Sequence, residues 1–128
     1  MKVSEEDFAK LAKLLKSTPE ELRGGNRNSS ITLKRKFLCK YLHDNLNLSN
    51  REIGELLEID HSTSSAARGR LDELISLYED TRMDYEQFEM AADGIFQLNK
   101  MIEGIDTSSP TNYFLSFQKM LNGLMNGI

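Results

Sequence analysis

Residues 49–74, SNREIGELLEIDHSTSSAARGRLDEL, decide the fold of this chain. Ser49 and Glu52 have the spacing of a capping box, which predicts that a short helix begins at this point. A tight turn follows, and Asp60 is a natural N-cap for a second helix. We therefore expect two helices joined by a tight turn, with the rest of the chain as their support.

The second helix of this pair, expected from His61 to about Tyr78, begins with an unusual run of small hydroxyl side chains. One side, which helical spacing directs toward the core, carries Ser64, Ala67, Leu71 and Leu74. The opposite side carries Ser62, Ser65, Ala66 and Gly69. Because this side has almost no bulk, its backbone can approach a ligand surface closely. The alternative is a weakly formed helix with a solvated face, although Glu and Lys would serve solvation better.

The flanking sequence divides the chain into three parts. Residues 1–29 are expected to form an N-terminal helix and a flexible polar linker that begins at Arg23. Residues 30–80 form the central helical domain, in which Gly54 costs about 1 kcal/mol relative to Ala and indicates close packing by a neighbouring helix. Residues 81–128 supply C-terminal helices, one of them starting at Ser109-Pro110 with Phe114 and Phe117 on its apolar face.

A heptad-like stripe runs along the first of these C-terminal helices. Its members are Tyr85, Phe88, Ala92, Ile95, Asn99 and Ile102. Two interpretations remain open: the stripe packs on the domain's own core, or it joins a second subunit. Residues 81–128 are thus a candidate region for a homodimer or a higher homo-oligomer.

Charge is segregated along the chain. The net charge is -4, yet residues 23–43 contain six basic residues and no acidic one. Lys34, Arg35 and Lys36 crowd the first half of the helix expected from Ser30 to Asn45, where they oppose the helix dipole. They form either a solvated face or a local contact surface for phosphate groups, whose attraction is short-ranged and salt-sensitive.

Composition argues against several classes of protein. No apolar run is long enough for a transmembrane span, and the charged first residues lack the apolar centre of a secretion signal. Cys39 is the single cysteine, and no Cys/His cluster has metal-ligand spacing. We expect a cytoplasmic protein without cofactor or metal. An enzyme is the weakest hypothesis, because there are only two histidines and no convergent set of carboxylates.

Three motifs carry a family resemblance: Arg35-Lys36-Phe37, Glu52-Ile53-Gly54 and Asp60-His61-Ser62-Thr63. Together with the Ala, Arg and Leu residues that follow, they resemble the C-terminal DNA-binding domain of the bacterial replication initiator DnaA. The resemblance covers Lys34 to Leu74. It implies an all-α fold with a helix-turn-helix whose second helix enters the major groove. It also implies that the third motif reads base edges and that Arg35 reaches into the minor groove.

The chain departs from that family's pattern in three ways. Its turn is shorter and lacks glycine, Ser64 and Ser65 replace aliphatic residues, and no P-loop for ATP is present. The implied protein is a DNA-reading module in a different, small protein, so its preference for the initiator's own binding site does not follow. The loss of bulk at Ser64 is expected to loosen the packing of the second helix or shift its register.

The function expected from the sequence is sequence-specific binding of double-stranded DNA, by a small regulator or an origin-type replication factor. The candidate DNA-binding residues are Lys34, Arg35, Lys36, Ser49, Asp60, His61, Ser62, Thr63, Ser65 and Arg68. One alternative is an oligomeric DNA-packaging or partition adaptor. Another is a protein-interaction module on a helix-turn-helix fold, which the acidic residues of the motif favour. The expected location is the nucleoid, or the host cytoplasm if the chain comes from a mobile element.

Overall fold

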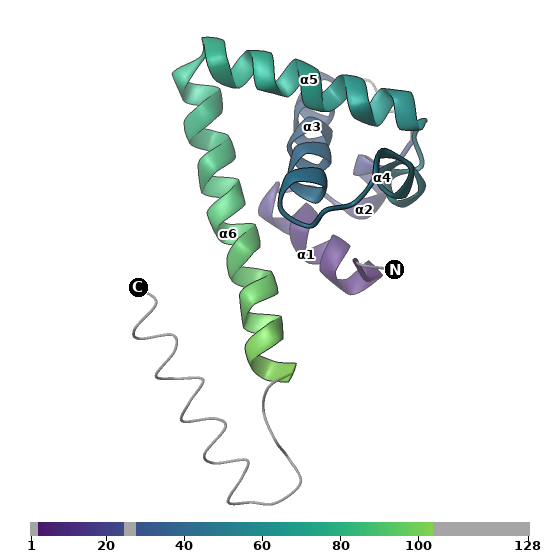
Figure 1. Ribbon diagram of the computed structural model, residues 1–128, viewed down its shortest axis with the longest axis vertical. Helices are drawn as coiled ribbons and strands as arrows, with labels where there is room; N and C mark the ends of the chain where they lie inside the picture. The colour runs from purple at the N-terminus through teal and green to yellow at the C-terminus, as the bar shows by residue number, and fades with distance from the viewer. Residues whose placement is uncertain (1–2, 25–27, 104–128) are drawn as a thin grey trace, which may run out of the picture. The chain divides into compact units, whose positions relative to one another are not determined.

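The computed structural model describes residues 3–24 and 28–103, with side chains up to residue 98, and every regular element in these ranges is a helix (Figure 1). The predicted all-α class is therefore confirmed for the described part of the chain. None of its helices has both the length and the apolar character needed to cross a membrane. The helices are α1 (Glu5–Leu14), α2 (Pro19–Leu22), α3 (Ser29–Asp44), α4 (Asn50–Leu57), α5 (His61–Leu77) and α6 (Glu79–Glu103).

The helix starts follow from capping side chains. Ser49 caps α4 in a complete capping box, because it accepts from the Glu52 amide at 3.1 Å while its own amide donates to the Glu52 carboxylate at 3.0 Å. Asp60, the N-cap predicted for α5, also accepts a backbone amide, as do Ser4 at the start of α1 and Thr18 at the start of α2. Helix α3 starts at Ser29, one residue earlier than predicted, because Asn28 caps it.

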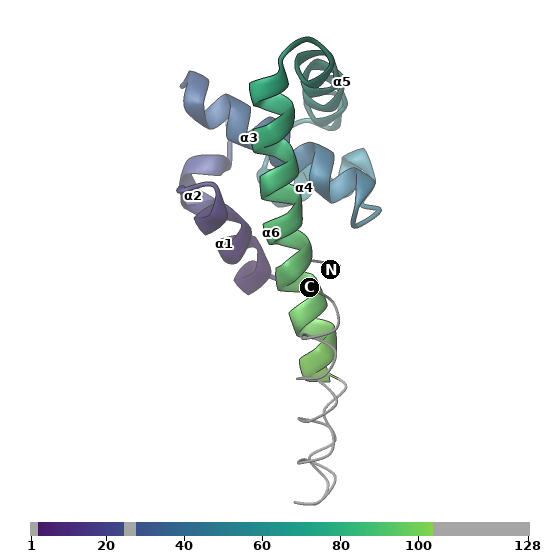
Figure 2. The ribbon, with the colours of Figure 1, turned by 90° about the vertical axis from the view of Figure 1, so that its left-hand side faces the viewer.

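Helix α3 lies at the centre of the core, between α2 and α5. Figure 1 shows α5 crossing α3, with α4 beside the first part of α5, and Figure 2 shows α1 and α2 on the other side of α3. The α3 side chains Leu38, Tyr41 and Leu42 are fully buried, and Phe8 of α1 and Ile53 of α4 are buried with them. Burying side chains of this size contributes about 1.5–3 kcal/mol each, which makes α3 the main support of the fold.

Small side chains form the contact between α3 and α5. Ser64 of α5 and Cys39 of α3 are both fully buried, and Leu71 continues the same inward side of α5. The inward direction predicted for Ser64 is therefore confirmed. Helix α5 keeps Ser64 and Leu71 inward, and the Ser64 hydroxyl lies next to the Cys39 thiol.

The turn between α4 and α5 depends on Gly54. Glu58 ends α4 with a left-handed backbone, φ 56°, and the Ile59 amide then donates to the Gly54 carbonyl at 2.9 Å. A Cβ atom on Gly54 would lie 2.6 Å from the Ile59 carbonyl oxygen, well inside van der Waals contact. The prediction of close packing at Gly54 is correct, but the neighbour is the backbone of the turn rather than another helix.

The segment after α2 is fixed where the sequence predicted a flexible linker. The Arg23 Nε donates to the carbonyl of Leu56 at 3.0 Å, and the Gly24 amide donates to the carbonyl of Leu57 at 2.9 Å. The same guanidinium pairs with Glu5 and lies 4.7 Å from the centre of the Phe8 ring. These contacts attach the N-terminal helices to the end of α4, so a linker starting at Arg23 is wrong. Residues 25–27 lie outside the described ranges.

The first part of α6 completes the core. Tyr85, Phe88 and Ala92 are buried. The rings of Tyr85 and Phe88 pack on Phe37 and Tyr41 of α3 with ring centres 5.4–6.0 Å apart. Of the two interpretations of the stripe, packing on the domain's own core is therefore correct for these three residues.

The structure divides the chain into two units, Met1–Ala92 and Asp93–Ile128, rather than at residues 29 and 80. The N-terminal helices and the first part of α6 share one core with α3 to α5, so the first unit includes segments that the sequence assigned to separate parts. In the second unit α6 continues to Glu103. The side chains of Asn99 and Ile102 and the helix predicted from Ser109, with Phe114 and Phe117, lie outside the described residues.

Candidate nucleic-acid interface

The first turn of α5 presents most of the predicted site residues together at the surface. Asp60 caps the helix by accepting from both the amide and the hydroxyl of Ser62 at 2.9 Å. The Ser62 amide holds the pKa of Asp60 below its ordinary value, so the carboxylate is charged at neutral pH. The His61 side chain is 74% exposed, and Thr63 and Ser65 are also exposed. The Asp60 cap therefore fixes the start of α5, from which His61, Thr63 and Ser65 point into solvent.

The small-residue side of α5 faces outward, as the helical spacing predicted. Ser62, Ser65, Ala66 and Gly69 are all exposed. A Cβ atom added at Gly69 would have no atom within 4 Å, so this part of the helix is open to an incoming surface. A flat partner could therefore come close to the α5 backbone along this side.

A shallow, mostly apolar groove separates α5 from the first half of α3. Lys36 and Thr32 lie on the α3 side, and Thr63, Ala66 and Arg70 lie on the α5 side. The placement of Lys36 agrees with a contact surface beside α5, and no ion pair of Lys36 is found within residues 3–24 and 28–98. Thr32 and Arg70 were missed, although helical spacing could have found them, because they lie four residues from Lys36 and seven from Thr63.

Arg35 does not point outward, and the prediction that it reaches into a minor groove is wrong for this structure. Its side chain is buried, with the residue only 8% exposed, and the Nε donates to the carbonyl of Leu22 at 2.9 Å. Burial lowers the pKa of its guanidinium. The physical reason is its place on α3, where it faces both α2 and the floor of the groove. Arg35 links the N-terminal helices to the core.

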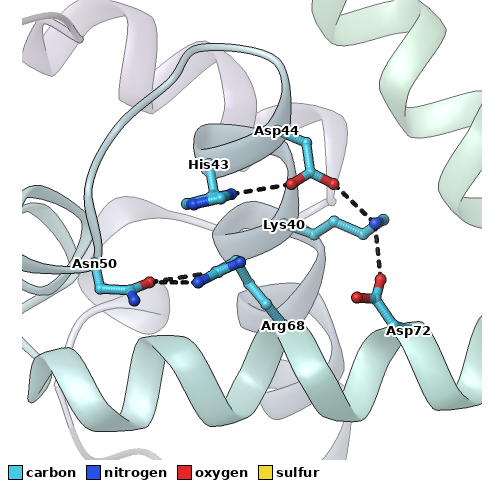
Figure 3. A network of polar contacts seen from close by, with 6 residues as sticks. All are labelled: Lys40, His43, Asp44, Asn50, Arg68 and Asp72. Atoms are coloured by element: carbon cyan, nitrogen blue, oxygen red, sulfur yellow. Dashed lines mark hydrogen bonds and ion pairs between the residues drawn. The ribbon is translucent and has the colours of Figure 1, made fainter.

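Two other cations of α3 are also directed away from the outward side of α5. The Lys34 Nζ lies 3.5 Å from the carbonyl of Lys16, next to α1, and its phosphate contact stays a prediction. Lys40 lies between Asp44 and Asp72, at 2.8 Å from each carboxylate (Figure 3). Partial burial acts to lower the pKa of Lys40, but the hydrogen bonds to both carboxylates raise it overall.

Arg68 forms a bridge between α5 and α4 instead of flanking the outward face. Its Nη2 and Nε donate to the Asn50 side-chain oxygen at 2.8 and 3.3 Å, as Figure 3 shows. Arg68 is half-buried and already engaged by Asn50, and a DNA contact at this residue stays a prediction. Ser49, one residue before Asn50, is exposed, and its hydroxyl serves as the cap of α4.

The chemistry available on this surface is hydrogen bonding and shape recognition. No group of three metal-ligating side chains occurs in the part of the chain that the structure describes. Burial raises the pKa of the Cys39 thiol to about 11, so this thiol is neutral and inaccessible.

Comparison with known proteins found no matching family model, no matching curated protein and no matching solved structure.

Proposed function

We propose that the protein binds double-stranded DNA sequence-specifically, with α4 and α5 acting as a helix-turn-helix and α5 lying in the major groove. The observation that carries this proposal is the outward side of α5, where exposed hydroxyl and small side chains sit opposite the buried Ser64 and Leu71. Short hydroxyls can hydrogen-bond to base edges or place a methyl group against thymine, and Asp60 can accept from a cytosine amine. The resemblance to the replication initiator's DNA-binding domain supports the same roles.

Phosphate contacts would come from few residues. Lys36 and Arg70 border the groove beside α5, and Arg70 also pairs with Glu73 at 2.9 Å. Each phosphate neutralised on duplex DNA contributes about -0.9 to the slope of log binding constant against log salt concentration. Two such contacts per chain would give a log–log slope of about -2, which is a weak salt dependence for a DNA-binding protein.

Selection of bound duplexes from a random pool tests the proposal. We expect enrichment of a short sequence, reduced by about tenfold or more when Thr63 or His61 is changed to Ala, because a good base contact contributes about 1–3 kcal/mol. Ser76→Ala is the matched control, since Ser76 is an exposed hydroxyl residue at the far end of the same helix. Lys36→Ala should lower affinity evenly across sequences. A pool that stays unenriched at moderate salt contradicts the proposal.

A protein partner is the second candidate, and the acidic tip favours it. Glu58 and Asp60 are exposed beside the first turn of α5, where they would oppose DNA phosphates. A basic protein surface would find these carboxylates complementary. The same pool selection separates the two functions, because a protein-interaction module would enrich no DNA sequence and would bind duplexes at most weakly.

A further inference from the structure

A second groove lies on the other side of α3, between α1 and the first part of α6. Its volume is about 430 Å³, and Phe37 and Phe88 form its floor. Leu14 and Leu33, both more than a third exposed, stand at its rim together with Lys16 and Asp84. The depression therefore combines an apolar floor with a rim that carries both apolar and charged side chains.

A ridge of uncharged side chains borders this groove on α6. Met83, Gln87 and Met90 follow one another at i, i+4 and i+7, so they share one side of the helix. Met90 is 75% exposed and Met83 is 47% exposed, whereas Gln87 also lines the groove itself. Gln87 therefore connects the groove with the exposed Met83 and Met90 around the surface of α6.

We propose that this face binds a second copy of the same chain, with Met90 of each copy entering the groove of the other. A two-fold interface uses the same patch on both copies, so it requires a depression and a projection on one surface. Methionine suits such a contact because its flexible, polarisable side chain fills irregular apolar gaps. The proposal concerns residues 3–92 and does not depend on whether the protein binds DNA.

The charges at the rim are consistent with self-association. Lys16 and Lys34 border the groove on one side and Asp84 borders it on the other, so both signs are present on the same patch. A two-fold axis brings the acidic side of one copy toward the basic side of its partner. Gln87 lies midway between Asp84 and Ala91, the first and last groove residues of α6, so two antiparallel α6 helices would cross near it.

Sedimentation equilibrium of the full chain tests the interface. We expect a dimer at micromolar concentration, and Met90→Lys should raise its dissociation constant at least about tenfold, which corresponds to 1.4 kcal/mol. Leu77→Lys is the matched control, because Leu77 is 72% exposed and lies at the end of α5, outside the groove. Circular dichroism of both variants checks that the helices are retained.

A cysteine substitution gives a second readout that does not depend on weakening the dimer. Gln87→Cys should form a covalent dimer rapidly under mild oxidation, while Leu77→Cys should do so slowly; the buried Cys39 is the same in both. A wild-type chain that stays monomeric at every concentration overturns the proposal. Equal weakening by Met90→Lys and Leu77→Lys, or equal cross-linking of the two cysteine variants, also overturns it.

Discussion

Replacing Gly54 with Ala should destabilise the protein, although alanine is the better helix former. In an open helix position this substitution gains about 1 kcal/mol. At Gly54 the new methyl group would lie 2.6 Å from the Ile59 carbonyl oxygen and 3.4 Å from the His61 amide nitrogen. Both neighbours are backbone atoms of the turn, so they cannot rotate away as the end of a flexible side chain would.

The expected magnitude follows from these opposing contributions. Forcing an extra methyl group into a closely packed position costs about 1–3 kcal/mol. Relief of the clash would also stretch the hydrogen bond from the Ile59 amide to the Gly54 carbonyl, which adds to the cost. We expect a net loss of roughly 1–2 kcal/mol in the free energy of unfolding, or about 4–8 °C in Tm for a chain of this size.

Gly69→Ala provides the matched control. Gly69 lies inside α5, and a Cβ atom there would meet nothing within 4 Å, so the same substitution should raise the free energy of unfolding by up to about 1 kcal/mol. Thermal unfolding followed by circular dichroism compares both variants with the wild type. If Gly54→Ala stabilises the protein as much as Gly69→Ala does, the close approach of the turn is not what holds α4 and α5 together.

Three further predictions concern polar and titratable groups. Arg68→Met removes both hydrogen bonds to Asn50 and should lower the free energy of unfolding by about 1–2 kcal/mol in urea titrations. An unchanged free energy of unfolding would show that these hydrogen bonds do not stabilise the fold. Lys40→Met should cost at most about 1 kcal/mol at neutral pH. Partial burial acts to raise the pKa of Asp44, but the hydrogen bonds from Lys40 and His43 outweigh it and lower the pKa overall. The difference in the free energy of unfolding between Lys40→Met and wild type should therefore shrink below about pH 4, as that carboxylate takes up a proton. Because burial raises the pKa of Cys39 to about 11, a thiol reagent should not react at pH 8 until urea unfolds the chain.

The sequence predicted the local structure of α4 and α5 well because the signals there are local. A capping box or an N-cap aspartate acts within three residues, and the inward side of α5 follows from helical spacing alone. The burial of Ser64 and the exposure of Ser65 and Ala66 both agree with that spacing. The shared core of α3 and α6 could be named only as one of two alternatives, because one amphipathic side can be covered by the same chain or by another.

The roles of the cations could not be predicted from the sequence, because each depends on residues far away along the chain. Arg35 donates to Leu22, 13 residues earlier, and Lys40 pairs with Asp72, 32 residues later. Neither the net charge nor the clustering of basic residues indicates which cations form hydrogen bonds or ion pairs within the fold. Of the three consecutive cations Lys34, Arg35 and Lys36, Lys36 borders the groove beside α5 without being buried as Arg35 is.

The attachment of Arg23 to the end of α4 has a consequence for how this domain can be handled. A fragment starting at residue 30 would remove the partner of Arg35 and uncover the carbonyls of Leu56 and Leu57, just before the turn. Such a fragment lacks three hydrogen bonds that the full domain has. Residues 3–24 support the geometry of the helix pair, and a shortened version without them should be less stable.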